Sequence, residues 1–339
     1  GETAIATYQL DGNGDDISGT YSATSTTDIG YTGLKFQPDF VWIKRRNAAD
    51  LHVLTDSVRG TSKQLFSDLA DAESVTNTRL TSFDTNGFTL SGSGTRVNDS
   101  GGTYVAWNWY APTAQSISAT GTGAGARLAS TIKKNVDAGF SIVSYTGGNN
   151  TNNIVGHGLD SAPELILFKS LTQNAKWEVY AEPIGANNYL TLNENNAKVP
   201  DIIRFRDTSP TDEVFTVGLA LNGNSIPYIA YCFTSILEYS KVGSYPGNGN
   251  ASGPIVPTGF EPGFLMIKNT NGIGPWFLFD NVRNPSNNRN RFLEADIDNI
   301  ESVGTSNDYV SFNSTNFTLT VNYSSLNGIG GTYLYLAIA

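Results

Sequence analysis

Oxygen-bearing side chains alternate with glycine near the start of the chain, in the stretch Asp11-Gly-Asn-Gly-Asp-Asp16. Asp11, Asn13 and Asp15 stand at alternate positions, as the ligands of a calcium loop do. The full helix-loop signature is not met, because its sixth and twelfth positions hold Asp16 and Ser22 instead of Gly and Glu. The motif therefore has two interpretations, a calcium site at Asp11, Asn13 and Asp15 or a plain Asx turn, and the turn is favoured.

The chain has two histidines and one cysteine. His52 occupies a position that two related stretches fill with tryptophan, which predicts a packing or surface position instead of a catalytic base. His157 lies in a Gly-His-Gly turn ahead of a strand, with no second His, Cys or Asp cluster nearby, so we expect a turn-capping or exposed side chain and not a metal ligand. Cys232 lies in an apolar run and is expected to be a small core side chain.

A charged motif, Asp-x-Val-Arg, occurs twice, at Asp56–Arg59 and Asp280–Arg283. An ion pair at the surface or in a turn is expected, with a functional pair as the alternative. The other carboxylates do not form the pair that glycoside hydrolysis needs, and the chain has no Gly-x-Ser-x-Gly elbow or phosphate loop. The sequence therefore predicts a protein that is not an enzyme and that has no cofactor except the calcium considered above.

Composition excludes two further classes. The net charge of −10 argues against a nucleic-acid partner. No stretch approaches the 18 or so consecutive apolar residues that a membrane-spanning helix requires. The many glycines and prolines favour short elements joined by tight turns.

The sequence pattern of the elements that must position these side chains occurs three times. A Pro-x-apolar strand ending in Lys occurs with the same spacing at Pro38–Lys44, Pro163–Lys169 and Pro262–Lys268. Eight residues after each lysine a second run begins, at His52, Trp177 or Trp276. A third landmark aligns Tyr104-Val-Ala106, Tyr228-Ile-Ala230 and Tyr335-Leu-Ala337. Such a recurrence indicates internal triplication.

The runs are short, β-branched and aromatic, and they are bounded by turn residues, which predicts an all-β chain. We expect three tandem antiparallel β-sandwich modules related by internal repetition. The predicted boundaries are residues 1–112 for the first module, 113–135 for a linker rich in Ala, Gly, Ser and Thr, 136–237 for the second module and 238–339 for the third.

Three smaller expectations follow from the same patterns. Residues 62–71 are a candidate for a short helix, and Asp68, Asp71 and Glu73 would lie on its solvated face. The five tryptophans fall in predicted strands, and most should be core residues. The last residues, 333–339, are an apolar strand, so we expect either that this strand docks into a sheet or that further chain follows Ala339.

Residues 136–339 resemble a repeat module of unknown function found in tail-fibre-like and other structural proteins of marine bacteriophages, including cyanophages. The resemblance is carried by Asp137-Ala-Gly-Phe-Ser-Ile-Val-Ser-Tyr-Thr-Gly147, Val155-Gly-His-Gly-Leu159 and Asp280-Asn-Val-Arg-Asn-Pro285. Residues 30–110 are similar to the same module, and the first thirty residues resemble the opening strand of a concanavalin-like sandwich.

The resemblance implies no activity and transfers no site residue, but it implies a place on the virion surface for a protein made in the host bacterial cytoplasm. The expected function is that of a virion structural protein, an exposed tail fibre or spike that mediates host attachment. The alternative is an architectural subunit, such as a capsid decoration or filament protein, and a glycan-cleaving enzyme is a third, weaker hypothesis. The expected partners are copies of the chain in a homo-oligomer, other virion proteins and host surface glycans.

Overall fold

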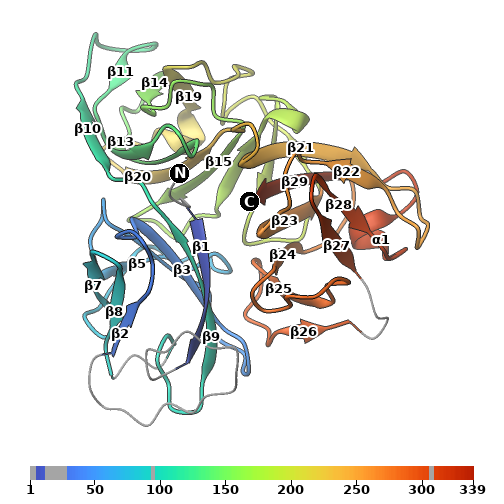
Figure 1. Ribbon diagram of the computed structural model, residues 1–339. Coiled ribbons are helices and arrows are strands. Elements are labelled where there is room, and N and C mark those ends of the chain that lie inside the picture. The colour runs from blue at the N-terminus through green and yellow to red at the C-terminus, as the bar shows by residue number, and fades with distance from the viewer. Residues whose placement is uncertain (1–4, 12–28, 93–95, 305–308) are drawn as a thin grey trace.

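The structure is a computed structural model that describes residues 5–11, 29–92, 96–304 and 309–339. It is nearly all β, with several antiparallel sheets. Figure 1 shows three lobes grouped around a common centre. We name the parts of the chain that form them the first segment (5–112), the second segment (113–237) and the third segment (238–339). Within the described residues, no helix is long and apolar enough to cross a membrane.

Nine strands lie in the described residues of the first segment. They are β1 (Ile5–Asp11), β2 (Ile29–Thr32), β3 (Phe40–Arg45), β4 (Val53–Asp56), β5 (Lys63–Gln64), β6 (Ser74–Val75), β7 (Leu80–Asp84), β8 (Gly87–Leu90) and β9 (Thr103–Trp109). A large sheet has the order β1-β9-β3-β4 and a small sheet the order β2-β8-β7, while β5 and β6 pair with each other.

The second segment contains the longest sheet. Its elements are β10 (Thr113–Ile117), β11 (Arg127–Leu128), β12 (Ser130–Asn135), β13 (Phe140–Thr146), β14 (Asn152–Gly156), β15 (Leu165–Ser170), β16 (Glu178–Ala181), η1 (Glu182–Ile184), β17 (Asn188–Thr191), β18 (Val199–Pro200), β19 (Val214–Gly218), η2 (Leu219–Leu221) and β20 (Pro227–Phe233). The large sheet has the order β10-β12-β13-β20-β15-β16-β17-β18 and the small sheet the order β11-β14-β19.

The third segment repeats this plan with fewer strands. Its elements are β21 (Ser240–Pro246), β22 (Ile255–Pro257), β23 (Phe264–Asn269), β24 (Trp276–Asp280), β25 (Arg291–Glu294), β26 (Ser302–Val303), β27 (Val310–Asn313), β28 (Asn316–Leu319), α1 (Ser324–Asn327) and β29 (Thr332–Ile338). The large sheet has the order β21-β29-β23-β24-β25-β26 and the small sheet the order β22-β28-β27. Strand β29, where the chain shown ends, lies between β21 and β23.

Four strands take the same order in each large sheet: β1-β9-β3-β4, β13-β20-β15-β16 and β21-β29-β23-β24. The lysine that ends each Pro-to-Lys run occupies the same place in this order, on β3, β15 or β23. Lys44, Lys169 and Lys268 are paired with Val105, Ile229 and Leu334, respectively. The spacing of the lysines therefore identified corresponding strands.

The third landmark of the sequence was misaligned by two residues in the third segment. Tyr333, and not Tyr335, corresponds to Tyr104 and Tyr228, because these three pair with the residue after the lysine. Each hydroxyl accepts a hydrogen bond from the backbone N–H five residues earlier in the chain. The donors are Asp99, Gly223 and Gly328, at 2.8, 3.1 and 2.7 Å. The misalignment arose because Tyr-Leu occurs twice in succession in β29.

Strand β3 shows why these strands are apolar on both faces. Phe40 and Trp42 belong to a central cluster, whereas Val41 and Ile43 belong to the core between the two sheets of the first segment. The second and third segments have inter-sheet cores of their own. A strand buried on both faces is a continuous apolar run instead of an alternating one, which is the pattern of all three Pro-to-Lys runs.

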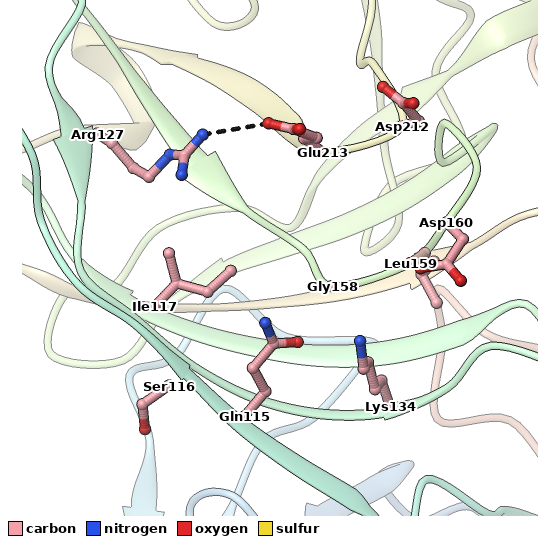
Figure 2. Close-up of a pocket in the computed structure, with 10 residues that line it drawn as sticks. All are labelled: Gln115, Ser116, Ile117, Arg127, Lys134, Gly158, Leu159, Asp160, Asp212 and Glu213. Atoms are coloured by element: carbon pink, nitrogen blue, oxygen red, sulfur yellow. Dashed lines mark hydrogen bonds and ion pairs between the residues drawn. The ribbon is translucent and has the colours of Figure 1, made fainter.

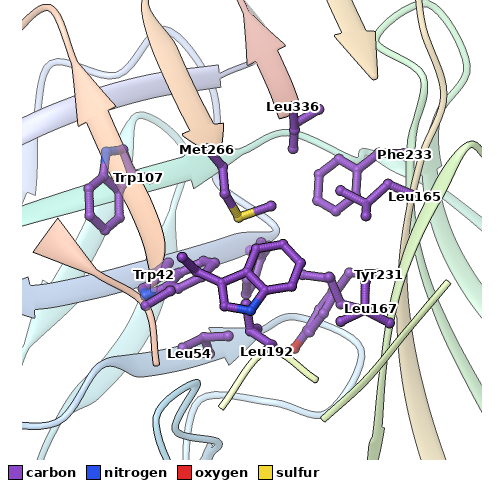
Figure 3. Close-up of a cluster of buried hydrophobic side chains, with 14 of the residues drawn as sticks. Trp42, Leu54, Trp107, Leu165, Leu167, Leu192, Tyr231, Phe233, Met266 and Leu336 are labelled. Carbon is purple, nitrogen blue, oxygen red and sulfur yellow. The ribbon is translucent and has the colours of Figure 1, made fainter. Parts of the chain in front are cut away.

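The central cluster joins the three segments. Its side chains, shown in Figure 3, include Trp42, Leu54 and Trp107 of the first segment, Leu165, Leu167, Leu192, Tyr231 and Phe233 of the second, and Met266 and Leu336 of the third. The ring centroids of Phe40 and Tyr231 are 4.3 Å apart, and those of Trp109 and Phe264 are 6.0 Å apart. The large sheets therefore pack against one another around one shared core.

Two local predictions differ from the structure. Residues 62–71 form no helix but strand β5 and a loop, because Leu65 and Phe66 bury on opposite sides, in the central cluster and in the inter-sheet core. Residues 113–135, expected as a linker, contain β10, β11 and β12, and β12 pairs with β13 along its whole length. Small residues hid these strands, since Ser, Thr and Gln can occupy the exposed faces of an edge.

Candidate functional site

The predicted calcium ligands are not placed by the structure. Asn13 and Asp15 lie outside the described residues, and only the backbone of Asp11, at the end of β1, is described. In the part of the chain that the structure does describe, no group of three or more His, Cys, Asp or Glu side chains could hold a metal ion. Cys232 is a core residue, as predicted, and burial raises the pKa of its thiol to about 12. All five tryptophans are buried as well.

The two Asp-x-Val-Arg motifs are ion pairs in turns, which was one of the two places expected for them, but they are buried and do not lie at the surface. Arg59 Nε donates to Asp56 Oδ2 at 2.5 Å, and Arg283 Nε donates to Asp280 Oδ2 at the same distance. In both turns the other carboxylate oxygen accepts the backbone N–H of the arginine. Burial opposes the charge of Arg59, but the carboxylate of Asp56 beside it raises the pKa of the guanidinium above its ordinary value. The pairs are therefore structural.

A glutamate completes each of these pairs. Arg59 Nη1 lies 3.1 Å from Glu73 Oε2, and Arg283 Nη1 lies 2.9 Å from Glu301 Oε1. Glu73 is thus held in a buried pair and not on a solvated helix face. The second segment lacks the whole set, and its corresponding residues are Ala181, Ile184 and Lys198. Replacement of all three together leaves no unpaired charge buried.

A ring side chain forms a hydrogen bond across each junction between segments. The bonds join Trp177 Nε1 to the carbonyl of Phe66 (2.7 Å), Trp276 Nε1 to the carbonyl of Thr191 (2.9 Å), and His52 Nε2 to the carbonyl of Glu294 (3.0 Å). His52 thus has a packing position, as predicted. It forms the same kind of junction hydrogen bond as the two tryptophans. Since Trp42 Nε1 donates to His52 Nδ1 at 2.9 Å, the proton of the neutral imidazole must be on Nε2.

The three corresponding lysines form a second set of bonds across the same junctions. Each is buried, and its ammonium donates to a backbone carbonyl of the neighbouring segment. The bonds join Lys169 to Ala70 (2.9 Å), Lys268 to Asn195 (3.1 Å) and Lys44 to Asp298 (3.3 Å). Burial lowers the pKa of each lysine to about 8. The second segment therefore donates a hydrogen bond to the first, the third donates to the second and the first donates to the third. The three junctions together form a closed ring.

We expect the stability of the His52→Gln variant to fall less at acid pH than that of the natural protein. Burial, followed by the charge of Lys44, lowers the pKa of His52 well below its usual 6.5, so the folded protein keeps the ring neutral while the unfolded chain takes up a proton. Below about pH 6.5 the free energy of unfolding of the natural protein should fall relative to that of the variant, by up to about 1.4 kcal/mol per pH unit. Urea unfolding at several pH values measures this difference.

Other titrating groups near His52 do not enter that comparison. Burial raises the pKa of the Asp68 and Glu294 carboxyls to about 7, so they take up protons in the folded state and act in the opposite direction. Lys44 and Arg283 stay charged below pH 7. All four are the same in both proteins, so their effects cancel in the difference. Parallel stability curves between about pH 7.5 and 5.5 would contradict the role given to His52.

An open recess on the second segment is the candidate site for a ligand. Its volume is about 620 Å³, within the usual range for small-molecule sites. Strands β10, β11 and β12 form one side, and the loops around residues 158–160 and 212–213 form the other. The lining residues, shown in Figure 2, are Gln115, Ser116, Ile117, Arg127, Lys134, Gly158, Leu159, Asp160, Asp212 and Glu213.

Two glycines let β10 approach the rest of the second segment. A Cβ atom at Gly156 would overlap the side chain of Ile117, and a Cβ atom at Gly158 would lie 3.1 Å from both Gln115 Oε1 and Lys134 Cδ. Gly158 also has a φ of +74°, which glycine adopts without strain. The Gly-His-Gly sequence therefore fixes the floor on which the polar side chains of β10 and β12 rest.

His157, between these glycines, ties together the two loops that carry the carboxylates. Its Nδ1 accepts the backbone N–H of Leu159 at 3.1 Å, which is the turn-capping role predicted for it. Its Nε2 therefore carries the proton and donates to the carbonyl of Thr211 at 3.0 Å. Burial lowers the pKa of His157 to about 4, so this link persists at neutral pH.

The recess carries charges of both signs. Arg127 Nη2 and Glu213 Oε2 form an ion pair across it at 3.4 Å, drawn as a dashed line in Figure 2. Among the residues that the structure describes, Lys134, Asp160 and Asp212 take part in no ion pair. The remaining lining side chains include the amide of Gln115 and the hydroxyl of Ser116. The site therefore offers hydrogen-bond donors and acceptors but no nucleophile–base pair.

The model of one protein family, described as a domain of unknown function (DUF7483), matches residues 17–339. The chain belongs to the DUF7483 family. The match covers all three segments, so the DUF7483 model describes the three-segment body and not a single repeat. No curated protein and no solved structure matches the chain. The description of DUF7483 names no activity and no source, so the resemblance to phage proteins stays a prediction.

The sequence did not predict the recess of this DUF7483 chain. Gln115 and Ile117 lie in the stretch expected to be a linker, and Asp160 lies in a different turn from Asp212 and Glu213. A signal was present in the alternation of Gln115 and Ile117 with Ala114 and Ser116, which is typical of a strand with one buried face. The junction bonds carried no signal, because their acceptors are backbone carbonyls.

Proposed function

We propose that this chain is a bacteriophage virion structural protein, an exposed appendage of the tail-fibre or spike kind that attaches the particle to the host surface. The resemblance of residues 136–339 to phage structural modules supports this proposal. So does the use of the buried Asp, Arg, His and Lys side chains, which hold the three segments together and are not arranged for catalysis. The observation that carries it is the open polar recess, the place on this scaffold where a surface ligand could be held.

We also propose a finer description of the fold, in which each segment is an antiparallel β-sandwich module and the three arose by repetition. The recurring strand order and the corresponding lysines support it. The modules would then form one fused body around a pseudo-threefold axis, since their junction bonds follow one another in a ring. Such a body would be made in the host cytoplasm and would lie on the virion surface beside other virion proteins.

An architectural role without receptor binding is the second candidate. It is favoured by Val75 and Val303, which lie on the corresponding edge strands β6 and β26 and are 70% and 52% exposed. Exposed apolar edges promote pairing with other chains. In this alternative the chain would be a capsid decoration protein or a filament subunit, assembled as a homo-oligomer.

Antibodies against the chain, labelled with gold and imaged on purified particles, test the proposal. We expect label on a fibre or spike, and we expect the purified chain to compete with particles for adsorption to host cells. Label spread over the capsid, with no effect on adsorption, would support the architectural role instead. Particles that take no label would overturn both candidates.

A further inference from the structure

The charges of the recess leave an excess of carboxylate. Arg127 and Glu213 neutralise each other, which leaves the ammonium of Lys134 and the carboxylates of Asp160 and Asp212. Figure 2 shows Lys134 and Gln115 rising from the strands on one side, while Asp160 and Asp212 come from the loops on the other. A ligand in the recess would meet donors on the strand side and anionic acceptors on the loop side.

Two buried polar atoms beside the recess have no partner within the described residues. They are Gln115 Oε1 and Arg127 Nε. A buried polar atom left without a hydrogen bond is costly, and in native proteins it usually has a water or ligand partner. The two atoms belong to side chains of β10 and β11, which line the recess. Gln115 and Arg127 therefore have incomplete hydrogen bonding, and the exposed parts of these side chains are the groups that a bound hydroxyl would meet.

Several ligand classes fit this lining badly. An anionic sugar or phosphate would face three carboxylates with only two cations present, and a polycation would be repelled by Lys134 and Arg127. The lining contains no aromatic ring, so stacking on the flat face of a sugar is absent, and apolar contact is limited to Ile117 and Leu159. A hydroxyl-rich ligand with a single positive charge satisfies both sides.

We infer that the recess binds a saccharide unit that carries a free amino group, with the ammonium at Asp160 and Asp212 and the hydroxyl groups at Gln115, Lys134 and Arg127. This inference rests on the proposed attachment role and names the class of host glycan that the site would take. His157 is a positioning residue for it, because it holds the loop of Asp160 against the loop of Asp212.

Calorimetric titration of the purified full chain with the methyl glycoside of glucosamine, at about pH 6 where its single amine is protonated, tests the inference. We expect one site per chain, and binding of the N-acetylated glycoside about tenfold weaker, as expected for the loss of a hydrogen bond between charged groups. The Asp160→Asn and Asp212→Asn variants should each reduce this preference. Both residues are exposed, so neither change should affect folding.

Glu238→Gln is the matched control, because Glu238 is an exposed carboxylate outside the recess and its removal changes the net charge equally. It should leave the titration unchanged. The inference is overturned if the methyl glycoside of glucosamine does not bind, if its acetylated form or the methyl glycoside of glucuronate binds equally well, or if the Asp variants bind like the control.

The two proposals fail separately. If the purified chain blocks adsorption and the Asp160→Asn variant blocks it equally, attachment stands and the recess is not the site. If particles carry no label, attachment falls, while the titration still reports on the recess.

Discussion

The Asp280→Ala variant should lose about 3–5 kcal/mol of its free energy of unfolding, the usual cost of breaking a buried ion pair. The carboxylate of Asp280 accepts hydrogen bonds from Arg283 Nε, from the backbone N–H of Arg283 and, across the junction, from Trp107 Nε1. Its removal leaves the buried guanidinium of Arg283 with one carboxylate, Glu301, in place of two, beside an indole N–H that has lost its acceptor. Urea unfolding followed by tryptophan fluorescence measures the loss.

The second segment supplies a control for this prediction. The double variant Asp280→Ala, Arg283→Ile reproduces the residues found there, Ala181 and Ile184. It should be more stable than the single variant although more has been removed, because the buried guanidinium that has lost the carboxylate of Asp280 is removed as well. Glu301 would keep its pairs with Arg46 and Arg291. If the Arg283→Ile change lowers the free energy of unfolding further, the loss in the single variant does not come from the buried guanidinium of Arg283.

Residues 113–237, produced alone, should not fold to a soluble monomer. The outer face of their large sheet carries Trp177, Tyr231 and Phe233, which are at most 5% exposed in the complete chain. Leaving each such side chain in water costs about 1.5–3 kcal/mol, and a small domain has no more than about 5–15 kcal/mol of stability. Size-exclusion chromatography with light scattering, together with circular dichroism, measures the outcome.

A variant of that fragment distinguishes two causes of insolubility, the exposure of apolar surface and the loss of the fold. Trp177→Gln and Phe233→Gln replace two of the exposed side chains by polar ones of similar reach, and they should increase the share of soluble material. A natural fragment that is already a well-folded monomer would show that the shared core is not needed by the second segment.

Much of the fold was predictable because strand signals are local. The Pro-to-Lys runs identified corresponding strands, and the apolar character of both faces of Phe40–Ile43 was written in consecutive residues. The closed ring was not predictable, since its acceptors are the carbonyls of Phe66, Thr191 and Glu294, whose side chains have nothing in common. A backbone acceptor leaves no trace in residue type.

The charged residues were harder to interpret than the apolar ones. Asp56 and Arg59 were expected to form a bridge at the surface or in a turn. The turn was predicted and the burial was not, and only the absence of the pair from the second segment pointed to burial. The same comparison explains Tyr231 and Trp107, which donate across a junction to Asp56 and Asp280. In the third segment the position of Tyr231 and Trp107 is held by Leu336, whose side chain has no hydrogen bond to donate. Its neighbour across the junction is the second segment, which has Ala181 in place of the aspartate.

Because the ring is formed by one polypeptide, its three segments can differ in sequence and in the surface that each presents. Three identical subunits would display any pocket three times, whereas strands β10 and β12 build theirs on the second segment. In the proposed attachment role, the recess of each chain would engage one receptor unit, and firm adhesion would then depend on the number of chains that one particle displays. Avidity would be set by how many bodies are assembled side by side, not by the symmetry inside each of them.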